Sequence, residues 1–470
     1  MSPRHLFLEL LSIDRLRNDA FEPHGKKNWE DAAADEAVAA PGREVDMPLG
    51  KMPVVDYECH PAFAGLDAKS DRAAEALIAE INTAYSQLLA EPAPAELLCT
   101  TFDRDIGPKF DALTDRLVAA ARPEFLDLLT QAMAIARKVL RSDLNERDNA
   151  SETKNSSAEE LRDHFKTGLS SFRQDGYYKF EVPRLAKFAW TTSILERAML
   201  RRKSRQIPQK HCVMSLHADS PACWAIARAM KKSGAVDFIS AYLGKPVDFC
   251  YAALDHAHPE QVWYQDCYND TKLGTSKTVY MHTDADTGII KAMMYLRDVH
   301  EIDGAFCFVP GSHKWDRSPL NVAVHKGFDE ATGYVFAGRP DNGEYYRPRF
   351  RHLESRRDML SLPLPLRGST HFGDDIVDGS ELSDALLGAE KRFIDPAGTI
   401  VMFDGSRGIH RGGLVKPGGS RWAVQLAFRV RKSPPPSGWR PIYMKVRGIL
   451  SYVKFVIVQT YLLARARPNS

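Results

Sequence analysis

The chain has 470 residues, which exceeds one typical domain and predicts two folding units. Hydrophobic residues make up 44% and charged residues 26%, as in ordinary globular proteins. A net charge of +2 gives no electrostatic reason to expect nucleic acid as a partner. Seven scattered cysteines without a C-x-x-C pair indicate neither a disulfide framework nor a zinc site, so we expect a cytoplasmic protein.

The amino-terminal part is rich in Ala, Asp, Glu and Pro and has no sustained hydrophobic period. We expect residues 1–65 to form a loosely ordered arm. Its beginning holds only a short apolar run, which Glu9 and Asp14 interrupt. Such a run lacks the long apolar core and the small-residue cleavage site of a secretion signal.

Residues 66–150 carry a helical pattern. Candidate helices cover residues 71–89 and 110–121, and a third begins at Pro123. The third has an apolar stripe with i, i+3 and i+4 spacing, formed by Phe125, Leu128, Leu129, Ala132, Met133, Ala136, Val139 and Leu140. We interpret the stripe as packing, and the region as a helical unit or a buttress for the domain that follows.

A polar stretch at residues 145–157 is the best candidate for a linker. Ser157 and Glu160 then form a capping box, so a second unit of residues 157–430 begins there. Its first expected elements are helices at 185–202 and 220–243 and a strand at 247–254.

Two short histidine patterns precede the main motif. His217 and Asp219 stand directly before a Ser-Pro pair that typically starts a helix, so we interpret them as a helix cap. His256 and His258 could form a metal pair, but Pro259 follows and no partner ligand is obvious. We interpret this second pattern as a surface loop.

The main motif is a second His-x-Asp pattern, His282 and Asp284, with the distant His410. In an extended strand, residues i and i+2 point to the same side, so His282 and Asp284 can both reach one metal ion. Two histidines and one carboxylate are typical of non-haem Fe(II) sites, where they hold one face of the octahedron and leave the other positions open. Asp286 is a less suitable ligand, because it would need a bulge to reach the metal.

Two cationic side chains are candidates for binding a carboxylate. The strand at 421–428 alternates between bulky residues and a small or polar face that carries Arg421, and a guanidinium on such a face can clamp a carboxylate. Lys291 lies inside the apolar strand at 289–296, either on a solvent face or as the buried partner of an anion. We predict both as cofactor-binding residues.

His282-Thr-Asp284, the segment from Asp303 to His313, and His410 with Arg421 eleven positions later resemble the phytanoyl-CoA dioxygenase family of Fe(II)/2-oxoglutarate oxygenases. The resemblance covers about residues 160–430. It implies a core that is a double-stranded β-helix, also called a jelly roll or cupin-like barrel. Together with the helical pattern of residues 66–150, this predicts an α+β fold with a helical buttress and a helical amino-terminal region.

The resemblance also implies roles for residues. His282, Asp284 and His410 would be the iron ligands and the catalytic residues, and Arg421 would hold the distal carboxylate of 2-oxoglutarate. Gln265 lies where the family places cosubstrate contacts, so we predict it as a third cofactor-binding residue. The chain departs from the family at Gly412, where many members carry a hydroxyl residue.

The activity implied is that of a dioxygenase that uses Fe(II), 2-oxoglutarate and O2 to hydroxylate a small-molecule or lipid-like substrate, releasing succinate and CO2. Asp284 favours hydroxylation, because halogenating relatives lack this carboxylate. The long segment between His313 and His410 is expected to be an insertion over the barrel mouth that selects the substrate. A cupin-like metal-dependent isomerase or epimerase, and a non-catalytic binding protein on the same fold, stay open as alternatives.

The carboxyl-terminal tail, residues 431–470, is basic and apolar. From Arg429 to Ser470 there are nine Lys or Arg residues and no Asp or Glu, and residues 448–464 are almost wholly apolar. Apolar residues flanked by basic ones suit a helix that lies on an anionic membrane surface. We therefore expect either peripheral membrane contact through residues 433–470 or a terminal helix docked on the protein.

Overall fold

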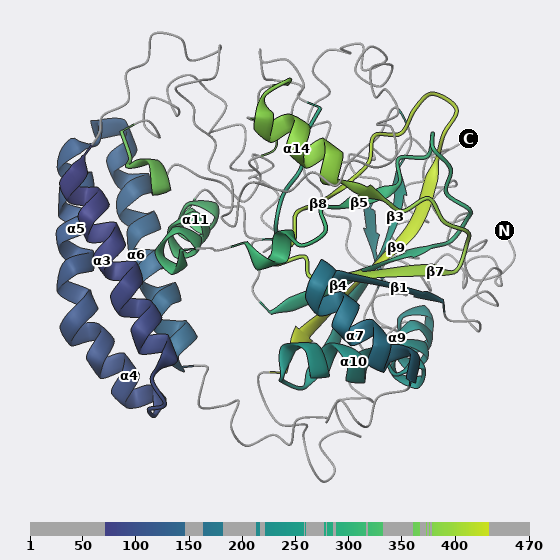
Figure 1. Cartoon of the computed structure of the whole chain (residues 1–470), viewed down its shortest axis with the longest axis horizontal. Helices are drawn as coiled ribbons and strands as arrows, with labels where there is room; N and C mark the ends of the chain where they lie inside the picture. Colours follow the sequence, from purple (N-terminus) through teal and green to yellow (C-terminus); the bar gives the residue numbers. More distant parts are fainter. Residues whose placement is uncertain are drawn as a thin grey trace, which may run out of the picture.

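The computed structural model describes, with short gaps, residues 71–145, 163–181, 213–216, 221–257, 277–331, 361–366 and 373–431 (Figure 1). The predictions for the arm, the linker, Gln265, the His217 pattern and the tail at 433–470 therefore fall outside the described residues. None of the helices in the described part of the chain has the length and apolar content of a membrane span.

The amino-terminal helices form a unit that lies apart from the sheets (Figure 1). Its elements are α3 (Arg72–Ala90), α4 (Ala95–Thr101), the π-helical turn η3 (Phe102–Ile106), α5 (Gly107–Ala120) and α6 (Pro123–Asn145). The Asp71 side chain caps α3 by accepting hydrogen bonds from the amides of Ala73 and Ala74, both at 3.1 Å. The three helices predicted here by hydrophobic period correspond to α3, α5 and α6.

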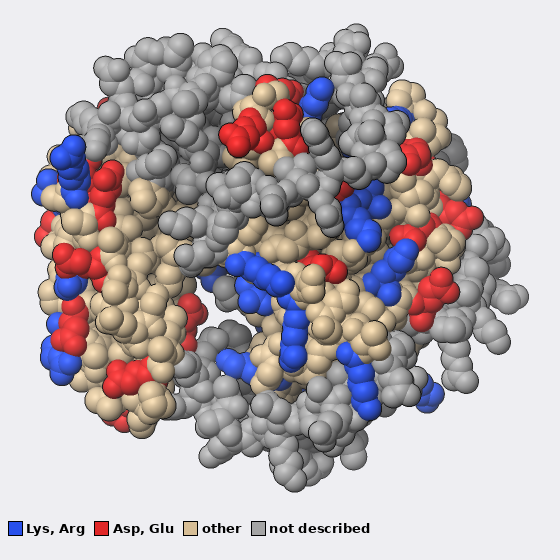
Figure 2. Space-filling view, viewed as in Figure 1, with Lys and Arg blue, Asp and Glu red and all other residues tan. Residues whose placement is uncertain are grey.

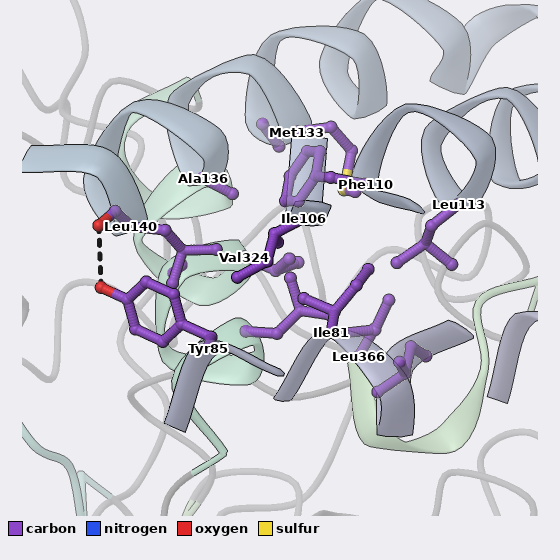
Figure 3. Packing of buried hydrophobic residues seen from close by; sticks show 14 of the residues in the cluster. Ile81, Tyr85, Ile106, Phe110, Leu113, Met133, Ala136, Leu140, Val324 and Leu366 are labelled. Carbon is purple, nitrogen blue, oxygen red and sulfur yellow. Dashed lines mark hydrogen bonds between the residues drawn. The ribbon is translucent and has the colours of Figure 1, made fainter. Parts of the chain in front are cut away.

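A helix from the second half of the chain completes this unit. Helix α11 (Pro319–Ala331) buries Leu320, Val324 and Phe328 in the same core as α3–α6. Figure 3 shows this core, with Val324 beside the labelled side chains of the amino-terminal helices and Leu366 of η9 (Leu364–Leu366) at its edge. The buried Tyr85 hydroxyl donates a 2.7 Å hydrogen bond to the Leu140 carbonyl. Part of the segment predicted as an insertion thus belongs to the helical unit.

The contact between α6 and α11 depends on small residues. A Cβ added at Gly327 of α11 would overlap the Ala132 carbonyl of α6. Ala136 and Ala323 are also buried in this core, and Phe328 stacks on Phe125 with ring centroids 5.9 Å apart. The two backbones therefore lie closer than larger side chains would allow.

Charged side chains of both signs are interspersed over the helical unit (Figure 2). Three ion pairs in contact with solvent are Lys109 with Glu80 at 2.6 Å, Arg116 with Asp71 at 2.5 Å and Arg137 with Asp111 at 2.5 Å. Because an exposed ion pair contributes only about 0–1 kcal/mol, the unit depends on its apolar core rather than on these pairs.

The second unit contains two antiparallel sheets. The six-stranded sheet has the order β1-β7-β4-β9-β3-β2, and the three-stranded sheet has the order β6-β5-β8. The strands are β1 (Tyr177–Glu181), β2 (Val213–Ser215), β3 (Val247–Ala257), β4 (Ile289–Tyr295), β5 (Phe306–Phe308), β6 (Lys391–Arg392), β7 (Thr399–Phe403), β8 (His410–Gly412) and β9 (Arg421–Val430).

Helices α7 (Asp163–Asp175), α9 (Pro221–Ser233) and α10 (Ala235–Leu243) cover the outer face of the larger sheet (Figure 1). The bulky face of β9, with Trp422, Val424, Leu426 and Phe428, packs in the same core as these helices, as its alternation predicts. The single helix predicted at 220–243 is two helices, because Gly234 has a left-handed φ of 92° at the junction.

The inner faces of the two sheets share a smaller core. Met293 and Tyr295 of β4, Phe403 of β7 and Ala423 of β9 pack with Phe306 of β5. A short helix, α14 (Glu381–Ala389), precedes β6, and the 3-10 turn η8 (Ser312–Lys314) follows β5. The predicted mixed fold with antiparallel sheets is confirmed, while closure of the sheets into a double-stranded β-helix stays a prediction.

We expect Gly327→Leu to destabilise the protein by roughly 2–4 kcal/mol, because the new side chain cannot fit between α11 and the Ala132 carbonyl. Urea denaturation followed by circular dichroism measures the change. Glu330→Leu adds the same side chain at an exposed position of α11 and should change stability by less than about 0.5 kcal/mol. Equal changes in stability for the two substitutions would contradict a close contact between α6 and α11 at Gly327.

Candidate metal centre

The backbone brings the two predicted histidine ligands together. His282 and His410 form an isolated antiparallel bridge, in which the His282 amide donates to the His410 carbonyl at 3.1 Å and the His410 amide to the His282 carbonyl at 2.9 Å. The Asp284 amide donates to the Gly405 carbonyl at 2.8 Å. Backbone hydrogen bonds therefore join two segments that are far apart in sequence, and they do so at the predicted metal ligands His282, Asp284 and His410.

The side chains of His282, Asp284 and His410 converge. One ligand atom from each lies within 4.8 Å of the other two, and Nε2 of His410 is 3.8 Å from Oδ2 of Asp284. Both histidines are buried, and their ring centroids are 4.2 Å apart. Among the described residues this is the one group of three or more His, Cys, Asp or Glu side chains that could hold a metal ion.

Each histidine has the tautomer that a metal ligand needs. Nδ1 of His282 lies 2.9 Å from the Tyr280 carbonyl, and Nδ1 of His410 lies 3.0 Å from the Gly408 carbonyl. Because a carbonyl oxygen can only accept, Nδ1 carries the hydrogen in both rings and the lone pair is on Nε2. Burial lowers the pKa of His282 to about 3 and also lowers the pKa of His410, so both rings are neutral at pH 7.

The third side chain has one oxygen held and one available. Nζ of Lys291 donates to Oδ1 of Asp284 at 2.5 Å, while the buried Oδ2 accepts no hydrogen bond. Burial alone would raise the pKa of Asp284, but the charge and the hydrogen bond of the Lys291 ammonium help to lower it below its usual value, so the group is a carboxylate. Gly405 leaves room for Oδ2, because an added Cβ there would overlap this oxygen.

These residues fit a first-row transition metal. Two neutral imidazole nitrogens and one carboxylate oxygen face a common point, and the unpaired Oδ2 would gain the partner that buried polar atoms normally have. The donor set contains no thiolate and a single carboxylate, so it suits Fe(II) better than calcium or a structural zinc ion.

The turn before His282 carries an unusual backbone. Tyr280 has a φ of 64°, a left-handed conformation that a non-glycine residue rarely adopts and that costs about 1–3 kcal/mol. This conformation accompanies the hydrogen bond from Nδ1 of His282 to the Tyr280 carbonyl, and the Tyr280 ring lies 4.3 Å from the His282 ring. Tyr280 therefore helps to orient a ligand.

One buried ion pair and one buried carboxylate hold the segment that bears His410. Arg411, next to His410, makes two hydrogen bonds to Glu390, at 2.5 and 2.9 Å, and one to the Lys277 carbonyl at 2.7 Å. The loop before His410 is held by Asp404, whose Oδ2 accepts from the Tyr242 hydroxyl and from Nε of Arg407, both at 2.8 Å. Both sides of the His282–His410 bridge are thus anchored to surrounding elements.

Arg421 is the first residue of β9 in the larger sheet, and its guanidinium lies against β8 of the smaller sheet, the strand that carries His410. A Cβ added at Gly412 would lie 3.1 Å from Nη2 and 3.3 Å from Nη1 of Arg421. Gly412 and His410 are two residues apart on β8, so they share a side of the strand and are roughly 6.6 Å apart along it. The missing side chain at position 412 thus gives space to the guanidinium.

The Arg421 guanidinium already has a carboxylate partner. Nη2 donates to Oδ2 of Asp255 at 2.9 Å, Nη1 donates to the Gly304 carbonyl, and both charged side chains are buried. The interpretation of residues 255–258 as a surface loop was wrong for Asp255 and His256, which lie buried in β3, where His256 stacks on Trp422 at 3.7 Å. Neither belongs to the metal cluster.

Of the six predicted site residues, the structure brings together His282, Asp284, His410 and Lys291, places Arg421 beside Gly412, and does not describe Gln265. Sequence reasoning missed Tyr280, Gly405 and Asp255. The charge of Asp255 directly after the strand residues 251–254 was the one usable signal, because a buried carboxylate needs a cationic partner.

Comparisons with known proteins agree with the sequence motifs. A model of the phytanoyl-CoA dioxygenase (PhyH) family matches residues 248–356, which include His282 and Asp284. No curated protein matches the sequence.

Similar solved structures include AviO1, SnoK and EctD. AviO1 from Streptomyces viridochromogenes Tue57 has 13% identity over 58% of this chain and 97% of its own, with a TM-score of 0.32. SnoK, a non-haem alpha-ketoglutarate-dependent carbocyclase from nogalamycin biosynthesis, has 13% identity, covers 59% and 87%, and has a TM-score of 0.31. EctD from S. alaskensis, with 2-oxoglutarate and 5-hydroxyectoine, has 14% identity, covers 62% and 85%, and has a TM-score of 0.34. Because these TM-scores are below 0.5, the likenesses add nothing to the family match.

We expect Gly405→Ala to weaken metal binding by roughly 10–100-fold, because the new methyl group displaces Oδ2 of Asp284. Isothermal titration with Mn(II), an air-stable substitute for Fe(II), measures the affinity. Gly107→Ala is the matched control, since its methyl group would meet only the flexible end of Arg137 at 2.9 Å. An unchanged Mn(II) affinity in Gly405→Ala would contradict the role of Oδ2.

Metal binding at pH 7 should release no protons from the histidines, because lowered pKa values leave both rings unprotonated before the metal arrives. The binding enthalpy of Mn(II) should therefore be the same in phosphate-free buffers of different ionisation enthalpy, and the affinity should be constant between about pH 6.5 and 8. A buffer-dependent enthalpy would show that a histidine is protonated in the metal-free protein.

Proposed function

We propose that this PhyH-like protein is an Fe(II)- and 2-oxoglutarate-dependent dioxygenase that hydroxylates a small-molecule or lipid-like substrate. We propose a double-stranded β-helix for its core, formed by the two antiparallel sheets. The observation that carries the proposal is the convergence of His282, Asp284 and His410 on one point, with neutral imidazoles and an available carboxylate oxygen.

In this proposal the three side chains bind Fe(II) through Nε2 of His282, Nε2 of His410 and Oδ2 of Asp284. Lys291 acts on the metal site rather than on the cosubstrate directly, because its ammonium holds Oδ1 and leaves a single oxygen for the ion. When bound, Fe(II) supplies the coordination positions at which 2-oxoglutarate and O2 react.

The surroundings of the site suit an oxidation that must exclude water. The Phe403 ring lies 4.8 Å and the Phe306 ring 6.1 Å from the His410 ring, so an apolar wall lies behind this ligand. An apolar enclosure limits side reactions with solvent. Arg421, beside Gly412, is the group that we propose for the distal carboxylate of 2-oxoglutarate, since guanidinium and carboxylate form paired hydrogen bonds.

The remaining predictions are part of the same proposal. The substrate is a small or lipid-like molecule. A cytoplasmic protein whose basic tail touches membranes would have access to such a substrate. Residues 433–470 would make that contact, and Gln265 would complete the cosubstrate site.

An anaerobic titration with Fe(II) and 2-oxoglutarate tests the function. We expect the weak visible charge-transfer band of the chelate in the unmodified protein, its loss in His410→Ala, and a requirement for at least roughly tenfold more 2-oxoglutarate in Arg421→Ala, because a charged hydrogen bond is lost. Asp248→Asn, which removes an exposed carboxylate of β3, is the control and should leave the band unchanged.

Absence of the band in folded, iron-loaded protein would overturn the proposal. The metal-dependent isomerase and the binding protein would then be the readings to pursue, because neither needs 2-oxoglutarate on the metal.

A further inference from the structure

Two Asp–Arg pairs lie at opposite ends of the paired strands β3 and β9 and differ in their exposure to solvent. At one end, Arg431, the residue after β9, and Asp248 of β3 are 2.6 Å apart and partly exposed. Near the other end, Arg421 and Asp255 are 2.9 Å apart, and both side chains are buried. The side chains of the first pair can form hydrogen bonds with water instead of with each other, whereas those of the second pair lie in the protein interior.

The buried pair is incompletely satisfied on the acidic side. Oδ2 of Asp255 accepts from Nη2 of Arg421, but its Oδ1 is buried and accepts no hydrogen bond. A buried carboxylate normally has both oxygens bonded, because each unbonded oxygen costs free energy. Asp255 therefore stabilises the fold less than a fully bonded carboxylate would, which suggests a role other than stability alone.

Its position gives Asp255 a direct effect on any anion that Arg421 binds. The guanidinium lies against Gly412, two residues beyond His410, so an anion that reaches it from the metal lies near Asp255 as well. Asp255 offsets the single positive charge of Arg421, and two carboxylates at one guanidinium repel each other strongly in a buried site. The cosubstrate must then share Arg421 with Asp255 or replace it there.

We propose that Asp255 is a specificity-determining residue: it is the resting partner of Arg421, competes with the distal carboxylate of 2-oxoglutarate, and limits how tightly the site holds this cosubstrate. The inference rests on the proposed function, because it assigns Arg421 to the distal carboxylate. It further implies that a 2-oxo acid without a distal carboxylate is not affected by Asp255.

The test compares two ligands and two matched variants. Asp255→Asn keeps the shape and an oxygen that can accept from Arg421 but removes the charge. Asp248→Asn makes the same change in the exposed pair at the other end of the two strands. Dissociation constants of 2-oxoglutarate and of 2-oxopentanoate, which lacks the distal carboxylate, are measured anaerobically on the Fe(II)-loaded proteins from the charge-transfer band.

We expect Asp255→Asn to bind 2-oxoglutarate roughly tenfold more tightly than the unmodified protein, since a repulsive charge is gone. Its affinity for 2-oxopentanoate should stay within about twofold, because this ligand makes no contact with Arg421. Asp248→Asn should change neither constant. Unchanged or weaker binding of 2-oxoglutarate to Asp255→Asn would overturn the inference and show that Asp255 only orients Arg421.

Stability gives a second readout, because Asp255→Asn leaves a buried cation without a counter-charge. We expect a lower melting temperature without cosubstrate and a larger rise on saturation with 2-oxoglutarate than in the unmodified protein. An equal or smaller rise would overturn the inference. Asp255→Ser serves as the second variant if Asp255→Asn does not fold.

The two proposals fail in different ways. If the unmodified protein binds Fe(II) but gives no band with 2-oxoglutarate, the proposed function fails and the inference with it. If the band forms normally and the Asp255 variants bind the cosubstrate no more tightly, only the inference fails.

Discussion

The pair of backbone hydrogen bonds between His282 and His410 is the constraint on which the candidate site depends. Paired strands are separated by about 4.8 Å, so residues bonded in this way hold their side chains at a fixed spacing. Asp284 extends the arrangement through its amide bond to Gly405, and Arg411, Glu390, Asp404 and Tyr242 anchor the segments on both sides. The ligand geometry is therefore set by backbone pairing before any metal binds, which is the preorganisation that a selective site needs.

The sequence was informative where chemistry depends on local spacing. His282 and Asp284 could be identified because i and i+2 residues share a side of an extended chain, and His410 with Arg421 because their spacing resembles a known family. Gly405, Tyr280 and Asp255 could not be identified in this way. Their roles depend on which atoms a distant segment brings near, and on a backbone conformation at Tyr280 that no propensity favours.

The difference between local spacing and contacts from distant segments also explains the errors in the predicted secondary structure. Hydrophobic period was sufficient for α3, α5 and α6, but the strand predicted to end at Leu254 continues to Ala257. Asp255 and His256 were interpreted as loop residues because Pro259 follows them and no partner was obvious in the sequence. Both are accommodated by partners from β9, the guanidinium of Arg421 and the ring of Trp422, and such partners are visible only once the strands are paired.

The place of α11 bears on how this chain can be divided. The helix lies between β5 and β6 in sequence, yet its apolar side chains Leu320, Val324 and Phe328 are buried by helices that precede the sheets. A fragment that begins at residue 157 would keep α11 and lose its covering, so these side chains would be exposed to solvent and prone to aggregate. The chain therefore returns to its first unit after the second has begun, so the amino-terminal helices and a segment of the second half depend on each other for burial.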